Sequence, residues 1–237
     1  MQPLVLGIDF NNLMYGSYYG DKYLNSRNEN VNAIRSFFTR LRDLKSALNP
    51  DHIIIANDLS RDKTFRRRIY AKYKANRKTE VDPDIRNQMS WALQILALMG
   101  YPIINNIEYE ADDILGMVSK YATNNKLDMI IVSADKDLYQ LINDTTYIYS
   151  IRNKELIDKD YLFNKYRLKP EQWIEMKIIV GDNGDNIPGV SGIGEIGALR
   201  LLKEFGTVDN IYNKITQVRP NLKIGRASCR ERVLRLV

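Results

Sequence analysis

The sequence predicts an α/β fold built on a parallel β-sheet, followed by a smaller helical part. Short apolar runs typical of buried strands occur at Leu4–Ile8, His52–Ala56, Pro102–Ile104 and Met129–Val132. Longer segments with helical spacing separate these runs, and strands that alternate with helices form a parallel sheet covered on both faces. From about residue 160 the pattern is helical. We therefore expect a sheet domain over residues 1–159 and a helical module over residues 160–223.

Composition and charge narrow the class of protein. The 237 residues are 44% hydrophobic and 27% charged, which is ordinary for a soluble chain with a buried core. No apolar run approaches the roughly 18 residues of a membrane span, and the N-terminus lacks a signal-peptide pattern. We therefore expect a cytoplasmic protein without membrane contact.

The single histidine and the single cysteine exclude several kinds of chemistry. His52 opens a strand-like run and is interpreted as structural, so no histidine base is expected. Cys229 lies in the tail of residues 224–237, so disulfide frameworks and cysteine metal sites are excluded. Four arginines and one glutamate give this tail +3 of the total formal charge of +6. The local clusters of charge are therefore more informative about binding partners than the total charge of the chain.

The first strand and the helix after it have clear boundaries. Asp9 closes the strand, and residues 11–30 are rich in Asn, Tyr and Gly, which predicts a loop. Apolar residues then recur at helical spacing from Val31 to Leu48, and Asn49 followed by proline ends that helix. Asp58 directly follows the second strand.

A basic segment with interleaved aromatic residues follows Asp58. Arg61–Lys78 contains nine Lys or Arg residues together with Phe65, Tyr70 and Tyr73. On a helix, five side chains would share one face: Arg66, Tyr70, Tyr73, Lys74 and Arg77. A basic run is usually a solvated face, but this density with aromatic residues favours phosphate contact and base stacking.

The next helix and the last strands complete the predicted sheet. Asp82 before Pro83 is an N-cap with proline at the first helical position, and this helix runs to about Met99. The third and fourth strands follow at the positions given above, and Tyr147–Tyr149 predicts a fifth strand.

Three carboxylates fall within four residues at Glu110, Asp112 and Asp113, directly before an apolar helical pattern. Acids are favoured at a helix N-terminus, because its free N–H groups and dipole attract negative charge. Capping explains one or two of them, but three carboxylates this close resist joint ionisation. A bound divalent cation would remove the conflict. Helix capping and a metal site both stay open for this stretch alone.

Acidic residues also follow the other predicted strands, namely Asp9, Asp58, and Asp135 with Asp137. In parallel sheets, ligands bind at the carboxyl ends of the strands. Adjoining strands would bring these residues and the Glu110 group to one edge of the sheet, which favours a metal site over capping.

The helical part contains a glycine-rich connection. Helices are predicted from Lys169 through Val180 and from Glu195 to Glu204, and Gly181–Gly194 lies between them with Asp182 and Asp185. A tight turn over Gly189–Gly194 can present backbone N–H groups at a helix N-terminus to a phosphate.

Six motifs occur in one order: Gly7–Asp9, Ala56–Asp58, Tyr73–Arg77, Tyr109–Asp113, Ser133–Leu138 and Gly181–Gly194. With them the chain resembles the 5′-nuclease family, also called flap endonucleases. This family includes the nuclease domain of bacterial DNA polymerase I and stand-alone bacteriophage 5′-exonucleases. The resemblance implies a PIN-like parallel-sheet domain with a helical arch over residues 1–159. It implies a helix–three-turn–helix DNA-binding module over residues 160–223.

The resemblance also implies roles for individual residues. A first metal cluster would comprise Asp9, Asp58, Glu110, Asp112 and Asp113. A second would comprise Asp135, Asp137, Asp182 and Asp185. The catalytic residues would include Asp112 and Asp135, together with the scissile-phosphate contacts Lys74 and Arg77. DNA would also be bound by Arg66, Tyr70 and Tyr73 in the arch, with Tyr73 stacking on a base, and by the turn residues Gly189, Val190, Gly192, Ile193 and Gly194.

The implied reaction is hydrolysis of phosphodiester bonds near the 5′ end of DNA, by a 5′-3′ exonuclease or flap endonuclease of replication and repair. Two Mg²⁺ ions, or Mn²⁺ in their place, would lie about 3.5–4 Å apart and stabilise the attacking and leaving oxygens. A K⁺ ion at the helical turn is also implied. We expect a monomer that acts on 5′ flaps and nicked or branched duplexes, in the host cytoplasm if the chain comes from a bacteriophage.

Alternatives stay open at this point. An RNase H-type enzyme would cut the RNA strand of an RNA–DNA hybrid, and a PIN-type ribonuclease would lack the second metal cluster. A non-catalytic DNA-binding module would have lost carboxylates, and none is missing here. Residues 224–233 resemble a translated sequencing adapter, so we interpret residues 224–237 as an artefact and the helical module as truncated.

Overall fold

The computed structural model describes residues 2–19, 23–59, 63–77 and 82–214. The chain divides into two compact units, which are described separately below. The first comprises residues 1–60 and 78–156, and the second comprises residues 61–77 and 157–237. The sequence analysis placed residues 61–77 in the sheet domain, whereas the structure groups them with the helical part. The tail, Cys229, Arg61 and Lys78 lie outside the described residues.

The first unit is built on a sheet with the strand order β3-β2-β1-β4-β5-β6. The strands are β1 (Leu4–Asp9), β2 (His52–Asp58), β3 (Ile103–Asn106), β4 (Asp128–Val132), β5 (Thr146–Ser150) and β6 (Glu155–Ile157). The pairs β1–β2, β1–β4, β2–β3 and β4–β5 are all parallel. This confirms the predicted parallel sheet and its five strands, and β6 is an addition that the sequence pattern did not reveal.

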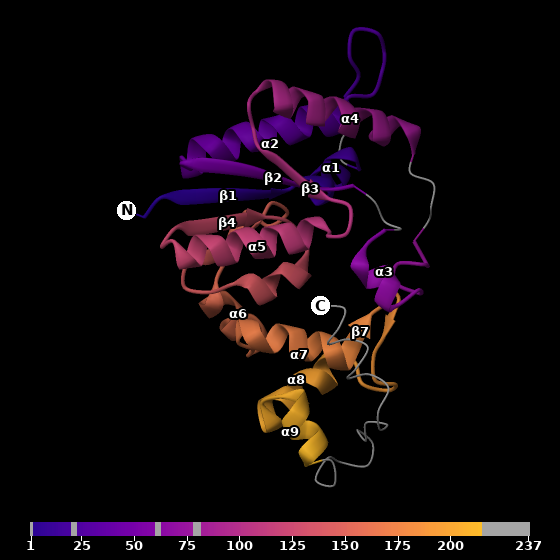
Figure 1. The fold of residues 1–237 in the computed structure, drawn as a ribbon, viewed down its shortest axis with the longest axis vertical. Helices are drawn as coiled ribbons and strands as arrows, with labels where there is room; N and C mark the ends of the chain where they lie inside the picture. The colour runs from indigo at the N-terminus through magenta and orange to yellow at the C-terminus, as the bar shows by residue number, and fades with distance from the viewer. Residues whose placement is uncertain (1, 20–22, 60–62, 78–81, 215–237) are drawn as a thin grey trace. The chain divides into compact units, whose positions relative to one another are not determined.

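Helices cover both faces of this sheet (Figure 1). They are α1 (Phe10–Tyr18), α2 (Asn32–Leu48), α4 (Pro83–Leu98), α5 (Ala111–Asn124) and the short 3₁₀ helix η1 (Lys136–Leu141). In Figure 1, α2 and α4 lie on one side of the strands and α5 lies on the other. The sheet is therefore a buried middle layer, which explains why its strands read as continuous apolar runs.

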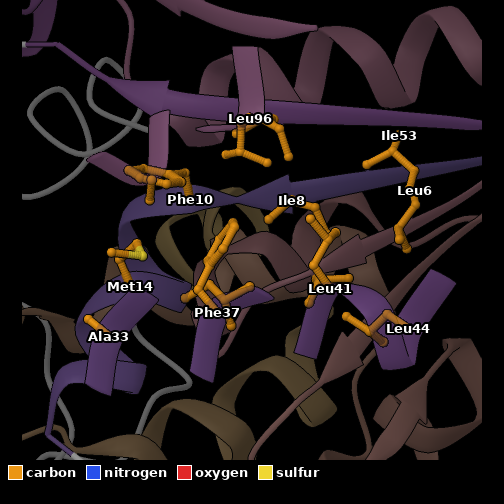
Figure 2. Close-up of a cluster of buried hydrophobic side chains, with 14 of the residues drawn as sticks. Leu6, Ile8, Phe10, Met14, Ala33, Phe37, Leu41, Leu44, Ile53 and Leu96 are labelled. Atoms are coloured by element: carbon orange, nitrogen blue, oxygen red, sulfur yellow. The ribbon is translucent and has the colours of Figure 1, made fainter. Parts of the chain in front are cut away.

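A hydrophobic core lies between the sheet and helices α1, α2 and α4 (Figure 2). Phe37 of α2 is fully buried there, and its ring meets the ring of Phe10 edge-on with centroids 5.4 Å apart. Successive strand residues point to opposite faces, so Leu6 and Ile8 of β1 both join this cluster. Burial of these side chains fixes the position of β1, and with it the position of Asp9.

Helix α1 corrects the sequence analysis, which predicted a loop over residues 11–30. Its buried residues Phe10, Leu13, Met14 and Ser17 follow helical spacing. The Asp9 side chain caps the helix by accepting a hydrogen bond of 3.1 Å from the Asn12 N–H. The Asn-rich composition hid this pattern, because asparagine favours turns when no tertiary packing is available.

Two other helices of this unit begin and end as the sequence predicts. Helix α2 ends at Asn49, which takes the left-handed conformation with φ of 43°, as asparagine often does. At the start of α4, the Asp82 side chain accepts a hydrogen bond of 2.9 Å from the Asp84 N–H, and Pro83 occupies the first helical position.

The second unit is mostly helical. It contains α3 (Phe65–Ile69), α6 (Lys159–Tyr166), α7 (Pro170–Val180), α8 (Glu195–Phe205), α9 (Val208–Asn213) and a hairpin of β7 (Gly181–Asp182) with β8 (Ile187–Pro188). Helices α7 and α8 confirm the two helices predicted on either side of the glycine-rich connection. The hairpin was not predicted, because its strands are only two residues long.

The basic segment does not form one helix, so the predicted single face is wrong. Helix α3 covers only Phe65–Ile69. The chain turns after Tyr70, and Lys74 takes a left-handed conformation with φ of 53°. Arg66 therefore lies on a helix, whereas Tyr73, Lys74 and Arg77 lie on a turn.

Candidate active site

Asp9 is the centre of the acidic edge in the first unit. It is the last residue of β1 and only 5% exposed. Its carboxylate accepts hydrogen bonds from the Asn12 N–H at 3.1 Å and from the Ser133 hydroxyl at 2.8 Å. β1 pairs with β2 on one side and with β4 on the other. The strand that carries Asp9 is therefore flanked by the strands that precede Asp58 and Asp135.

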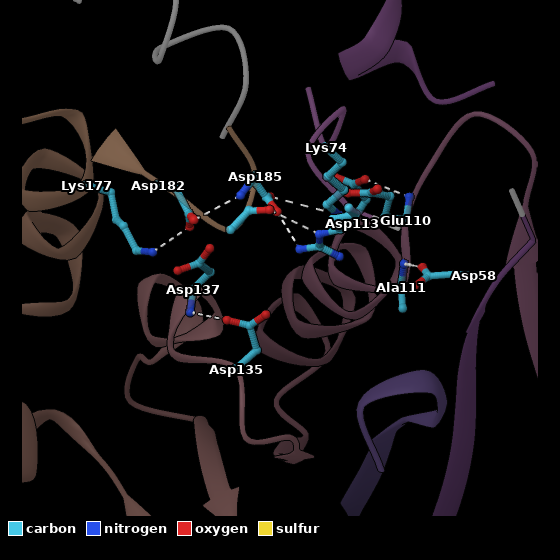
Figure 3. Close-up of polar contacts among 12 residues, drawn as sticks. Asp58, Lys74, Glu110, Ala111, Asp113, Asp135, Asp137, Lys177, Asp182 and Asp185 are labelled. Atoms are coloured by element: carbon cyan, nitrogen blue, oxygen red, sulfur yellow. Dashed lines mark hydrogen bonds and ion pairs between the residues drawn. The ribbon is translucent and has the colours of Figure 1, made fainter. Parts of the chain in front are cut away.

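The N-terminus of α5 brings its acids to the same edge (Figure 3). The Ala111 N–H, one of the helix's free donors, donates to the Asp58 carboxylate at 2.6 Å. The Glu110 N–H donates to the Asp113 carboxylate at 2.9 Å. Glu110 is buried, and Asp112 and Asp113 are half-buried in the first turn of the helix. Helix capping thus explains the position of Asp113. Asp58, which belongs to strand β2, accepts a hydrogen bond from a second N–H group at the N-terminus of α5.

The segment after β4 is tied to Asp9 by a serine. The Ser133 hydroxyl donates to Asp9 and accepts from the Asp135 N–H at 3.0 Å. The Asp137 N–H in turn donates to the Asp135 carboxylate at 2.9 Å (Figure 3). Ser133 therefore connects two predicted metal ligands through one buried hydroxyl.

Two asparagines at the start of α1 complete this edge. The Ala134 N–H donates to the Asn12 side chain at 2.9 Å, and the Asp58 N–H donates to the Asn11 side chain at 3.3 Å. Sequence analysis gave no role to Asn11 or Asn12, nor a separate one to Ser133. Their position directly after strands β1 and β4 was the one available signal.

The electrostatics show that the carboxylates at this edge act on one another. The pKa of Asp9 is raised to about 7, chiefly by burial and also by the charges of Asp58 and Asp135, while the hydrogen bonds from Asn12 and Ser133 act in the opposite direction. The carboxyl ends of these three strands therefore meet as the sequence predicts, while the metal-binding role of the residues stays a prediction.

The donor set fits a hard divalent cation. The oxygens of Asp9, Asp58 and Asp135 are typical ligands for Mg²⁺ and Mn²⁺. Within the described ranges, no three His, Cys, Asp or Glu side chains lie close enough together to hold one ion. Mg²⁺ usually keeps several waters and needs only one or two carboxylates. The residues therefore fit such an ion without forming a complete protein shell around it.

The second unit holds the two remaining predicted ligands, Asp182 and Asp185 (Figure 3). The Asp182 carboxylate accepts from Lys177 Nζ at 2.8 Å and from the Asp185 N–H at 3.1 Å. Burial alone would raise the pKa of Asp182. The hydrogen bond and charge of Lys177, with the N–H groups of Asp185 and Gly184, outweigh that effect and hold the pKa below its usual value.

Both predicted phosphate-binding cations pair with Asp185. Arg77 Nη2 lies 2.5 Å from one carboxylate oxygen, and Lys74 Nζ lies 3.9 Å from the other. The Arg77 Nε–H also donates to the Gly184 carbonyl at 3.1 Å. The structure therefore brings Lys74 and Arg77 together at one carboxylate, and their contact with the scissile phosphate stays a prediction.

The aromatic part of the basic segment is less accessible than expected. Tyr73 is only 2% exposed and Arg66 only 8% exposed, whereas Tyr70 is half-buried. A ring must present an open face to stack on a base. The Tyr73 ring presents no such face, and Lys74 Nζ lies 4.8 Å from its centroid, so the structure argues against the predicted stacking.

The glycine turn is held by a close backbone contact. A Cβ on Gly189 would lie 2.0 Å from the Val180 carbonyl oxygen, so only glycine fits. The Val190 N–H donates to the Ile179 carbonyl at 2.7 Å, and Gly194 is the N-cap of α8. Ile193 is buried. Of the predicted turn residues, Ile193 can therefore contribute only its backbone to DNA binding.

Comparison with known proteins agrees with this architecture. The family model described as the 5′-3′ exonuclease N-terminal resolvase-like domain matches residues 4–167. The one described as the 5′-3′ exonuclease C-terminal SAM fold matches residues 168–233, which includes most of the tail. The chain is 35% identical to a 5′-3′ exonuclease of Halalkalibacterium halodurans, over 93% of this chain and 76% of the relative.

Longer proteins and solved structures are also similar. DNA polymerase I of Borreliella burgdorferi is 39% identical, over 91% of this chain but only 24% of the polymerase. The T5 5′-exonuclease has a similar fold, with a TM-score of 0.72 and 20% identity over 98% of this chain and 82% of the exonuclease. The catalytic core of Rad2 gives a TM-score of 0.58 with 17% identity over 92% of this chain and 67% of that chain. The two family models and the H. halodurans relative show that this chain belongs to the 5′-3′ exonuclease family of nucleases.

Proposed function

We propose that this nuclease cuts phosphodiester bonds near the 5′ end of flapped, nicked or branched DNA, using Mg²⁺ held at the acidic edge. The observation that carries this proposal is the position of Asp9 between Asp58 and Asp135 at the ends of adjoining parallel strands. A buried carboxylate surrounded by like charge must either take up a proton or be joined by a cation. A bound divalent ion would therefore favour the ionised form of Asp9 at this edge.

Bound divalent ions would stabilise charge on the reacting phosphate and lower the pKa of a water. The chain's own residues would hold and orient the components. Asp9, Asp58 and Asp135 would supply carboxylate ligands to the ions. The hydrogen bonds from Ser133 and Asn12 hold the Asp9 carboxylate in position. By resemblance to the family, Glu110, Asp112 and Asp113 would belong to the first metal cluster with Asp9 and Asp58. The second cluster would comprise Asp135, Asp137, Asp182 and Asp185.

Lys74 and Arg77 would offset charge on the pentacoordinate phosphate. Both already pair with a carboxylate, Asp185. A phosphate oxygen carries the same sign of charge as that carboxylate, and Arg binds either group through its planar guanidinium. Their present partner therefore supports an anion-binding role for these two cations.

Related structures support DNA and metal binding for the family. A bacteriophage T5 flap endonuclease was solved as a complex with DNA and metal ions, and the T5 5′-exonuclease was solved with zinc. We propose Mg²⁺ as the working ion, with Mn²⁺ able to replace it, and a K⁺ ion at the Gly189–Gly194 turn. We also propose that the chain acts as a monomer in the cytoplasm. Among the described residues, no helix is long and apolar enough to span a membrane.

The test is cleavage of a 5′-labelled flap duplex by the full chain, with Mg²⁺ or with chelator. We expect Mg²⁺-dependent release of short 5′ products. Asp135→Asn should lower the rate at least about 100-fold, because one stabilising group of the transition state is lost, and leave duplex affinity largely intact. Asp43→Asn is the matched control, since Asp43 is an exposed residue of α2 paired only at the surface with Arg42.

Two outcomes would contradict the proposal. An Asp135→Asn variant that cuts at the wild-type rate in Mg²⁺ would remove this carboxylate from the active site. Duplex binding without cleavage in either Mg²⁺ or Mn²⁺ would instead indicate a non-catalytic module. An RNA-containing flap in the same assay decides whether RNA–DNA hybrids are also cut.

A further inference from the structure

Two asparagine side chains connect the basic turn to the β7–β8 hairpin. The Asn76 side-chain amide donates to the Asn183 carbonyl at 2.6 Å. The Asn186 side-chain amide donates to the Lys72 carbonyl at 2.8 Å. The basic turn and the hairpin thus each donate one side-chain hydrogen bond and accept one, although they are more than 100 residues apart in the sequence. We name these two hydrogen bonds the amide clasp.

The clasp brackets a residue in an unfavourable conformation. Lys74 has a φ of 53°, in the left-handed region that residues with a Cβ rarely adopt. Its N–H donates to the Asp185 carbonyl at 2.9 Å. Such a conformation persists only where the surroundings hold it, and it is typical of functional sites. The two hydrogen bonds of the clasp lie one on each side of Lys74 in the sequence, at Lys72 and at Asn76, and so are well placed to hold it.

The same turn determines where the two cations point. Arg77 reaches the hairpin twice, at the Gly184 carbonyl and at Asp185, and Lys74 reaches Asp185 from the other side. If Lys74 relaxed to an ordinary backbone conformation, its N–H would leave Asp185 and its side chain would turn away. The position of both cations therefore depends on contacts that neither of them makes by itself.

We propose that Asn76 and Asn186 are positioning residues for cleavage, which hold Lys74 and Arg77 in the geometry that receives the scissile phosphate. This inference rests on the proposed function of those two cations. Asparagine suits both places because its amide is an uncharged donor to a carbonyl, whereas aspartate could only accept. Asn186 itself has a φ of 58°, which asparagine tolerates better than most residues.

The most direct variant is Asn186→Gly, because glycine keeps the left-handed backbone while removing the amide. Asn76→Ala removes the other bond. Asn164→Ala is the matched control, since Asn164 is an exposed asparagine of α6 in the same unit. Flap cleavage by the full chain in Mg²⁺ gives kcat and KM for each variant.

We expect kcat to fall about tenfold in Asn186→Gly and in Asn76→Ala, because small displacements of a positioning group slow the chemical step. KM should stay within about twofold, since the proposed duplex contacts of the Gly189–Gly194 turn are unchanged in both variants. The control should match the wild type. Equal kcat in wild type and in both clasp variants would overturn the proposal, and so would a fall in all three variants together.

A second measurement is independent of activity. Hydrogen exchange of the Lys74 amide, followed by NMR, should be at least about tenfold faster in Asn186→Gly, because local opening exposes it. The Ala198 amide in α8, bonded to the Gly194 carbonyl, should exchange unchanged. Unaltered exchange at Lys74 would refute the clasp. A wild-type chain that does not cut in Mg²⁺ but shows faster Lys74 exchange in the variant would refute the proposed function and leave the clasp's structural role standing.

Discussion

Removal of the Ser133 hydroxyl tests how the acidic edge is held together. Ser133 is buried, donates to the Asp9 carboxylate at 2.8 Å and accepts from the Asp135 N–H at 3.0 Å. Ser133→Ala leaves the buried Asp9 carboxylate and the half-buried Asp135 N–H without this contact. A hydrogen bond to a charged group contributes about 1.5–3 kcal/mol, and a neutral one about 1 kcal/mol. Together they predict a loss of about 2.5–4 kcal/mol in the free energy of unfolding when Asp9 is ionised.

Ser119→Ala provides the matched control. Ser119 is also buried in the first unit, and its hydroxyl shares a neutral hydrogen bond of 2.9 Å with the Thr146 hydroxyl. Its loss should cost only about 1 kcal/mol. The assay is urea unfolding followed by circular dichroism at about pH 8, with chelator, for wild type and both variants. Flap cleavage in Mg²⁺ should fall for Ser133→Ala and not for Ser119→Ala.

The pH dependence identifies the charge on Asp9 as the cause. The raised pKa of about 7 means that Asp9 is ionised at about pH 8 and protonated at about pH 5.5. The hydroxyl favours the ionised form, so its removal raises the pKa of Asp9 further. Its contribution therefore grows as the pH rises above about 7 and is lost as the pH falls below that value. The penalty of Ser133→Ala should therefore approach that of Ser119→Ala at the lower pH. Equal penalties at the higher pH would refute the reasoning.

Two further pairs of substitutions, each a test and its control, probe the glycine turn and the core. Gly189→Ala should destabilise the second unit by about 3 kcal/mol or more, because its Cβ would meet the Val180 carbonyl oxygen at 2.0 Å. Gly16→Ala, with nothing within 4 Å, should instead stabilise α1 by about 0.5–1 kcal/mol in thermal unfolding. Phe37→Ala should cost about 3–5 kcal/mol in urea unfolding, since the ring is fully buried. Phe163→Ala, at a ring that is 52% exposed, should cost less than about 1 kcal/mol, and similar losses for the two rings would contradict the assigned core.

The sheet and the acidic edge followed from local patterns in the sequence. Apolar runs of strand length, separated by helical periods, are specific to a layered parallel sheet. In such a sheet all carboxyl ends meet at one edge, so the positions of Asp9, Asp58 and Asp135 after their strands were enough to predict that they converge. Helix ends were predictable for the same reason, because Asp82–Pro83 and Asn49 act on backbone groups only a few residues away.

Long-range contacts decided the features that the sequence pattern did not reveal. The residues around Asn11 and Asn12 have the composition of a loop. They form helix α1 because Phe10, Leu13 and Met14 pack in the core against the sheet. The basic segment has the pattern of one helix. It forms a turn instead, and hydrogen bonds join that turn to the hairpin more than 100 residues later in the sequence. Periodicity records only which neighbours along the chain share a face. The sequence alone therefore determined the layers and the acidic edge, and only tertiary hydrogen bonds and burial decided the conformation of Lys74, the burial of Tyr73 and the bridging role of Ser133.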